Sequence, residues 1–125
     1  MINFEKLKIE GNEPIYVQLV SFVKQGLAAG EIESGDELPS RRVVSALLGI
    51  NPNTVQKAYA ILEDEDLIRS RPGAKSCISA GPGKIAEIRT ILAEESGRRA
   101  IEALKAAGFT KEEALYVIEK YWEEE

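Results

Sequence analysis

The sequence predicts a mainly α-helical protein with a small β-hairpin: a winged helix-turn-helix followed by a two-helix dimerisation hairpin. Three observations lead to this fold class. Two helical stretches stand about three residues apart with a glycine between them, which is helix-turn-helix spacing. A hairpin with a basic tip follows the second of these stretches. Beyond a Gly-Pro-Gly sequence at 81–83, the pattern becomes wholly helical.

The first helix is expected to begin at Pro14 and to end at Gly30. Proline suits the first helical position because its missing N–H has no partner within the helix there. Apolar side chains then recur at helical spacing, at Ile15, Leu19, Phe22, Val23 and Leu27. This periodicity is typical of a support helix that packs on a core.

Local capping signals bound the second and third helices. Ser40 can cap a helix over 41–48, and Gly49 suits the left-handed residue that ends such a helix. Asn51 can cap the third helix, which is expected over 52–65 with proline at its first position. The inner face of the third helix is expected to carry Val55, Ala58, Tyr59 and Leu62.

A hairpin is expected over 67–79, after the third helix. Apolar residues on both sides flank the sequence Arg-Pro-Gly-Ala-Lys at 71–75, which is a turn signal with a basic tip. The following Gly-Pro-Gly is the clearest boundary in the chain. We therefore expect a winged helix-turn-helix domain over 1–80 and a helical tail over 84–125.

The tail is predicted to be a pair of amphipathic helices. A long helix should end at Gly108, and Thr110 with Glu113 forms a capping box that opens the last helix, with the acids at 123–125 as its solvated end. Such a pair cannot cover its own apolar face, so it must pack on the first domain or on a second copy. The expected dimer interface comprises Ile88, Ile91, Leu92, Ile101, Leu104, Leu115, Ile118 and Trp122.

Composition argues against several classes of protein. The 125 residues suit one small domain with an appendage, and they include one cysteine, Cys77, and no histidine. A lone cysteine forms no internal disulfide and no structural zinc site, and histidine is the commonest general base and metal ligand. We therefore expect no enzyme, no metal and no cofactor.

The sequence shows no signal for membrane or export. No apolar run approaches the roughly 18 residues that read as a membrane-spanning helix. The first residues lack the apolar stretch and the small-residue cleavage site of a signal peptide. A cytoplasmic protein with no membrane partner is expected.

Charge is distributed unevenly along the chain, whose formal net charge is −5. Residues 38–82 hold six basic and four acidic side chains, whereas 83–125 hold seven basic and ten acidic ones. A nucleic-acid partner requires a basic face, not a basic sum over the chain. The acidic total therefore does not exclude double-stranded DNA as the partner of the first domain.

The exposed start of the third helix carries side chains that can recognise bases. Asn and Gln bond bidentately to adenine, Thr contacts a base or a phosphate, and Lys binds phosphate or guanine. The candidates are Asn51, Asn53, Thr54, Gln56 and Lys57. The alternative is that Asn51 only caps the helix and that the others are ordinary solvated residues.

Backbone phosphates are expected to pass the start of the second helix and the hairpin tip. The candidates there are Ser40, Arg41, Arg42, Arg71, Gly73 and Lys75. Arg41 and Arg42 point about 100° apart on a helix, so both cannot be equally placed. The alternative for these arginines is a surface charge or a salt bridge to the acidic stretch 63–66.

The chain resembles the GntR family of bacterial regulators over about residues 10–80. The resemblance rests on Gly-Asp-Glu-Leu-Pro-Ser-Arg-Arg at 35–42 and Leu-Gly-Ile-Asn-Pro-Asn-Thr-Val-Gln-Lys-Ala-Tyr at 48–59. Pro-Ile-Tyr-Val-Gln-Leu at 14–19 matches the family's first helix. The short helical tail looks like that of the YtrA subfamily. This resemblance implies a homodimeric repressor that binds a two-fold symmetric operator, often beside ABC-transporter genes.

The resemblance also implies roles for single residues. Arg42 matches the family's phosphate-contacting arginine, and Gly73 matches the wing glycine. Asn53, Thr54 and Gln56 match base- and phosphate-contacting positions of the recognition helix.

The sequence departs from the family pattern at three places. Pro52 replaces an arginine that is common in other subfamilies, and Asp66 replaces the usual glycine before the Leu-Ile strand. The hairpin, at 73–78, lacks the second glycine and the aromatic residue of the usual wing. These changes put a guanine contact at 52 and the wing contacts in doubt.

Two other interpretations stay open. The overall acidity and the altered hairpin also suit a winged-helix protein-interaction module that does not bind DNA. Some GntR proteins are fused to an aminotransferase-like domain, so the chain is also compatible with a regulatory piece of a longer enzyme. The sequence identifies no effector pocket, because aromatic residues at helical spacing in the tail are more often core or interface.

Overall fold

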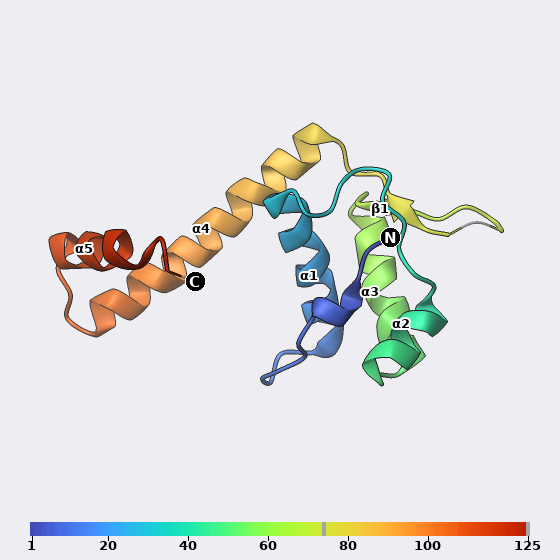
Figure 1. Ribbon diagram of the computed structural model, residues 1–125, viewed down its shortest axis with the longest axis horizontal. Coiled ribbons are helices and arrows are strands. Elements are labelled where there is room, and N and C mark those ends of the chain that lie inside the picture. The colour runs from blue at the N-terminus through green and yellow to red at the C-terminus, as the bar shows by residue number, and fades with distance from the viewer. Residues whose placement is uncertain (74, 125) are drawn as a thin grey trace. The chain divides into compact units, whose positions relative to one another are not determined.

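The computed structural model of the protein describes residues 1–73 and 75–124 (Figure 1). Ala74, in the predicted turn, and Glu125, at the predicted solvated end, lie outside the described residues. The chain divides into two compact units, Met1–Arg89 and Thr90–Glu125. The elements are η1 (Phe4–Lys6), α1 (Ile15–Ala29), α2 (Arg41–Leu48), α3 (Pro52–Asp64), β1 (Ile68–Arg69), β2 (Cys77–Ile78), α4 (Pro82–Ala106) and α5 (Lys111–Tyr121).

In the first unit, α1 packs against α3, and α2 packs against α3 on the other side of the helix-turn-helix (Figure 1). Pro14 lies one residue outside α1 as its N-cap, with φ −53° and ψ 140°. The side chains that fill the space between the helices are almost fully buried: Leu19, Val23, Leu27, Val44, Val55, Tyr59 and Leu62. Apart from Val44 of α2, these positions belong to the faces that the sequence periodicity predicts to be inner.

The second and third helices begin and end at their local caps. Ser40 Oγ accepts a hydrogen bond from the Val43 backbone N–H at 3.2 Å. Gly49 ends α2 with φ 65°, a left-handed conformation that costs glycine little. The predicted helix-turn-helix is therefore confirmed, and α3 ends one residue before the predicted Glu65.

A left-handed residue turns the chain from α3 into the hairpin. Asp66 has φ 60°. Among the described residues it is the one with a positive φ that is not a glycine. Aspartate tolerates this conformation better than most side chains because its short polar group bonds locally. Asp66 therefore adopts a left-handed turn at the position where the resemblance leads us to expect glycine.

The β-hairpin forms one side of a small sheet that two further segments extend. Strands β1 and β2 are antiparallel, with Ile68 opposite Ile78. The connector before α2 pairs with the outer side of β2 through a bridge between Glu37 and Cys77. The Ile2 N–H in turn donates to the Glu37 carbonyl at 2.8 Å. The sequence predicts only a turn in the connector and no structure for the N-terminal segment.

The N-terminal segment is part of the core of the first unit. Ile2 and Phe4 are 6% and 1% exposed, and the Phe4 ring lies 5.4 Å from the Phe22 ring, centroid to centroid. η1 also packs against α2. The packing of the N-terminal segment against α1 and α2 therefore stabilises the first unit, although this segment carries no periodic signal in the sequence.

Helix α4 begins at Pro82, within the predicted Gly-Pro-Gly boundary, and continues past the point where the two compact units divide. The units divide further along the chain than the predicted boundary because the first turns of α4 pack within the first unit. Ile88 is 7% exposed there, and Arg89 Nη1 donates to the Ala28 carbonyl. Ile88 is therefore part of a core within one chain, which removes it from the expected dimer interface.

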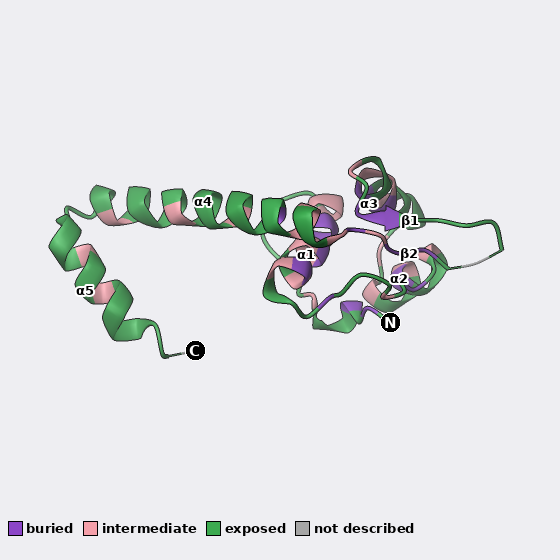
Figure 2. Cartoon of the chain, turned by 90° about the horizontal axis from the view of Figure 1, so that it is seen from above, coloured by how far each residue is buried: buried purple, intermediate pink, exposed green. Residues whose placement is uncertain are grey.

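The second unit consists of the remainder of α4 and α5. The predicted capping box is present: Thr110 Oγ1 accepts from the Glu113 N–H at 3.2 Å, and Glu113 Oε1 accepts from the Thr110 N–H at 2.9 Å. None of the described residues from 90 to 124 is buried, as the exposed surfaces of both helices show (Figure 2). The unit has helices with apolar faces but no core of its own.

Candidate nucleic-acid interface

The start of α3 presents polar side chains to solvent. Asn53 and Gln56 are exposed, and Thr54 is half-buried. Asn51 Oδ1 accepts a hydrogen bond from the Asn53 N–H at 2.8 Å, so this oxygen caps the helix. The interpretation of Asn51 as a cap therefore holds for its oxygen, and Asn53 and Gln56 have the greater freedom to meet bases.

Lys57 is held by an aromatic ring from another helix. Its Nζ lies 3.9 Å from the ring centroid of Tyr16 on α1. A cation over an aromatic face gains about 0.5–1 kcal/mol at an exposed site. The ring orients the Lys57 side chain without neutralising its charge. Because Tyr16 is distant from Lys57 in the sequence, sequence analysis missed this contact.

Arg41 and Arg42 occupy the first turn of α2, and this turn contains no acidic residue. Cations at a helix N-terminus oppose the helix dipole at a cost of about 0.3–1 kcal/mol each. Arg42 is exposed, whereas Arg41 is half-buried. The two arginines therefore differ in environment, as their helical spacing predicts, and an anion bound nearby would offset their unfavourable placement.

The Arg41 guanidinium stacks on Tyr59, a residue of α3. Its central carbon lies 5.0 Å from the ring centroid. Its Nε is shielded from solvent and has no hydrogen-bond partner among the described residues. Tyr59 of α3 therefore orients the Arg41 side chain, while the Nε–H donor of Arg41 still lacks an acceptor among the described residues.

Tyr59 fixes the segment before α2 to the recognition helix. Its hydroxyl donates to the Pro39 carbonyl at 2.6 Å in a buried position. Burial raises the pKa of Tyr59 above its usual value, and the nearby Arg41 charge opposes that change only in part. Tyr59 therefore keeps its proton and remains a donor.

The acidic stretch 63–66 has partners other than the arginines of α2. Glu65 pairs with Lys24 of α1 at 2.8 Å between Oε1 and Nζ. Glu63 Oε1 accepts from the Ser70 N–H at 3.3 Å. These contacts tie the end of α3 to α1 and to the hairpin, and they leave Arg42 exposed to solvent.

The hairpin carries exposed basic side chains beside the start of α2. Arg71 and Lys75 are exposed, and Gly73 has φ 72°. The two hairpin arms are joined by a hydrogen bond of 2.8 Å between the Ser70 and Ser76 hydroxyls. A cavity of about 290 Å³ brings Lys75 and Gly73 together with Ser40 and Arg41.

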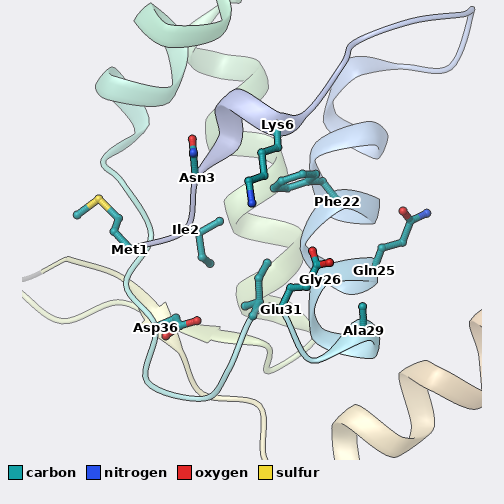
Figure 3. Close-up of a pocket in the computed structure, with 11 residues that line it drawn as sticks. Met1, Ile2, Asn3, Lys6, Phe22, Gln25, Gly26, Ala29, Glu31 and Asp36 are labelled. Atoms are coloured by element: carbon teal, nitrogen blue, oxygen red, sulfur yellow. The ribbon is translucent and has the colours of Figure 1, made fainter. Parts of the chain in front are cut away.

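Another cavity of about 390 Å³ lies between the N-terminal segment, α1 and the connector before α2 (Figure 3). Ile2, Phe22 and Ile32 contribute apolar atoms to it, and Lys6 and Glu31 contribute charges. Its lining includes none of the residues predicted to bind DNA. The candidate interface is therefore the surface formed by the start of α3, the start of α2 and the hairpin.

The chain is similar to known bacterial regulators. The family model for bacterial regulatory proteins of the gntR family matches residues 15–77. YhcF of Bacillus subtilis, an uncharacterized HTH-type transcriptional regulator, is 29% identical over 93% of this chain and 96% of its own length. The HTH-type transcriptional repressor YtrA of Bacillus subtilis is 41% identical over 53% of this chain and 51% of its own length.

A solved structure shares most of this fold. A GntR family transcriptional regulator from Listeria monocytogenes superposes with a TM-score of 0.80 and 28% identity, over 90% of this chain and 98% of its own. The predicted fold class is confirmed. No helix in the described part of the chain is long and apolar enough to cross a membrane.

Proposed function

Because this chain belongs to the GntR family and resembles its YtrA-like members, it is a DNA-binding transcription regulator, and we propose that it is a homodimeric repressor of a two-fold symmetric operator. In this proposal it acts on double-stranded DNA in the cytoplasm and is not an enzyme. The first domain, 1–80, reads DNA, and the tail, 84–125, forms the dimer.

One observation carries the DNA-reading part of the proposal. Exposed Asn53 and Gln56 open α3, exposed Arg42 opens α2, which packs against α3, and a cavity joins the start of α2 to the basic hairpin. Recognition helices enter the major groove with their N-terminal residues, and flanking cations bind phosphates. The proposed contact residues are those predicted from the sequence, with Asn53, Gln56 and Arg42 as the principal ones.

The second unit supports the dimer. Ile101, Leu115 and Ile118 are 53%, 52% and 43% exposed, and all three line an apolar cavity of about 600 Å³ between α4 and α5. Exposed apolar surface of this kind is unfavourable in water and typically marks an interface. A second copy presents the same surface, so a two-fold interface would cover both.

Repression and the identity of the target genes rest on similarity alone. YtrA, which this chain matches over the helix-turn-helix, is a repressor. Repression of an ABC-transporter operon is part of the proposal on the strength of the YtrA-like resemblance. Transcript levels in a deletion strain test it, because a repressor's own targets rise when the gene is removed.

Selection from a random pool of duplexes tests the operator. The full chain should enrich a sequence with two inverted half-sites, whose centres are spaced by about one helical turn or a multiple of it. Enrichment of a single asymmetric site would contradict the two-fold operator. The absence of any enrichment would instead favour a protein-interaction module, for which the acidic net charge of −5 is the motivating observation.

Substitution of Arg42 tests the phosphate contact. Arg42→Ala should weaken binding to every duplex by about 1–3 kcal/mol per protomer, because each protomer then forms one charge-assisted hydrogen bond fewer. Gel-shift titration against the selected operator and against unrelated DNA measures the effect. Lys8→Ala removes an exposed lysine between η1 and α1, outside the proposed DNA and dimer contacts, and should change neither affinity. An unchanged affinity for Arg42→Ala would remove Arg42 from the site.

A further inference from the structure

The cavity between the start of α2 and the hairpin has the charge of an anion site. Ser40 and Arg41 line it on one side, and Gly73, Lys75 and Ser76 line it on the other. Arginine and lysine are the charged side chains of this lining, and the described lining residues include no carboxylate. Clefts lined by one sign of charge concentrate ions of the opposite sign.

Arg41 is held in this cavity with hydrogen-bonding capacity unused. The side chain is half-buried over Tyr59, and its Nε has no acceptor among the described residues. A guanidinium has five N–H donors and no acceptor, and a desolvated donor without a partner is costly. The arginine is therefore positioned and partly dehydrated before any ligand arrives.

Neighbouring groups do not provide the missing negative charge. The Tyr59 hydroxyl donates to the Pro39 carbonyl, and its burial keeps it protonated. Glu65 of the nearby acidic stretch is paired with Lys24. None of the described residues that line the cavity offers Arg41 an anion, so an anion from another molecule can complement it.

We propose that this cavity seats one phosphate group of the DNA backbone, held by Arg41 and by Lys75 from opposite walls. The inference rests on the proposed function. Arginine binds phosphate oxygens with its planar fork, and lysine binds them as a point charge. A single phosphate then connects α2 to the hairpin, so the position of the wing on DNA is set from the start of α2.

The hairpin side of the cavity is open to a backbone phosphate. A Cβ atom added at Gly73 would meet no atom of the described, non-adjacent residues within 4 Å, and Lys75 is exposed. Inorganic phosphate has the same chemistry as a backbone phosphate and fits the same charges. The experiment must therefore separate these two sources.

Replacement of single phosphates on the selected operator tests the proposed phosphate site between Arg41 and Lys75, called the seat below. Each backbone phosphate in turn is changed to an uncharged methylphosphonate, and Kd is measured for the full chain, Arg41→Ala and Lys75→Ala. On unmodified DNA each variant should raise Kd by about tenfold or more. Each should also reduce the slope of log Kd against log salt by about 0.9 for every phosphate that the variant no longer neutralises. When the methylphosphonate stands at one particular position in each half-site, Arg41→Ala and Lys75→Ala should both bind as tightly as the wild type does on that same modified DNA.

Further variants separate charge from structure. Arg41→Lys keeps the charge but lacks the fork, so it should give a weaker Kd with the wild-type salt slope. Lys8→Ala, at an exposed residue outside the proposed DNA and dimer contacts, should keep both the Kd and the slope. Lys75→Ala alters an exposed hairpin residue, so it still tests the seat if Arg41→Ala fails to fold.

Three results would overturn the proposed phosphate site alone. Penalties that disappear at different phosphates for the two variants would separate Arg41 from Lys75. Variants with wild-type Kd and slope, while the wild type still binds the operator, would remove the seat and leave the proposed function intact. The third result is an NMR titration in which inorganic phosphate shifts the Arg41 Nε–H resonance to saturation, while no methylphosphonate position on the operator removes the penalties. That result would assign the cavity to the free ion. A wild-type chain that enriches no duplex would overturn the proposed function as well.

Discussion

Tyr59 contributes both to the core of the first unit and to the proposed DNA-binding surface. Its ring lies in the core of the first unit, its hydroxyl holds the Pro39 carbonyl, and its outer face carries Arg41. The hydrogen bond is buried, so the carbonyl cannot turn to water when the donor is removed. One aromatic side chain therefore fixes both the recognition helix and the segment that enters α2.

Removal of the Tyr59 hydroxyl should destabilise the protein. We expect Tyr59→Phe to lower the free energy of unfolding by about 1–3 kcal/mol, because the Pro39 carbonyl loses its buried donor. Urea unfolding at fixed protein concentration measures this. Tyr116→Phe, at a side chain that is 64% exposed, is the matched control and should have no effect. An equal midpoint for both variants would show that the buried bond is dispensable.

The same residue gives the protein a pH dependence. Burial raises the folded-state pKa of Tyr59, so the protonated tyrosine stabilises the fold below its unfolded pKa of about 10. That stability is lost as the pH rises above this value, because the unfolded chain then releases the proton more readily. The difference in unfolding free energy between wild type and Tyr59→Phe should therefore shrink above pH of about 10.

At the scale of elements, α5 depends on its local cap more than the helices of the first unit do. The capping box at Thr110 and Glu113 satisfies backbone N–H groups, while none of the described side chains of α5 is buried. We expect Thr110→Ala to destabilise α5 by about 0.5–2 kcal/mol. Amide hydrogen exchange along α5 measures this, and Thr110→Ser should retain protection. Unchanged exchange in Thr110→Ala would mean that packing, not the cap, holds α5.

Elements with local signals could be predicted from the sequence, and those that depend on distant partners could not. α2 follows from Ser40 and Gly49, and the capping box follows from the spacing of Thr110 and Glu113. The pairing of Ile2 with Glu37 joins segments that share no local pattern. Such pairings depend on tertiary contacts. The sequence alone therefore predicts no strand for the N-terminal segment or for the connector before α2.

The candidate site divides in the same way. The exposure of Asn53, Gln56 and Arg42 could be predicted, because helical spacing determines which face a residue occupies. The stacking of Arg41 on Tyr59 and of Lys57 on Tyr16 could not, since each pair joins different helices. Sequence analysis therefore identified groups that can bind DNA but not the rings that aim them.

At the scale of the whole molecule, the two units have different sources of stability. The first unit has a core, whereas the described part of the second unit exposes large apolar side chains, with Trp122 at 76%. Burial of apolar area contributes about 25 cal/mol per Å², so these side chains would gain most from association with another copy. The stability of the second unit should therefore depend on protein concentration.

A charge on the apolar face of the tail should separate the subunits. We expect Leu115→Glu to give a monomer at micromolar concentration, because it would place an unpaired carboxylate within the proposed interface. Sedimentation equilibrium measures the mass, and affinity for the selected operator should fall because only one half-site is then held. Gln25→Glu adds the same charge to an exposed position of α1 and should remain dimeric. A monomeric wild type would contradict the interface directly.

The pairing of Ile2 with Glu37 has a practical consequence for work with this protein. The N-terminal segment is the outer neighbour of the sheet whose other edge is the hairpin. A purification tag fused ahead of Met1 therefore begins one residue from a backbone pairing that supports the wing. Such a fusion would weaken measured DNA affinity without touching any contact residue, so binding assays should use protein from which an N-terminal tag has been fully cleaved.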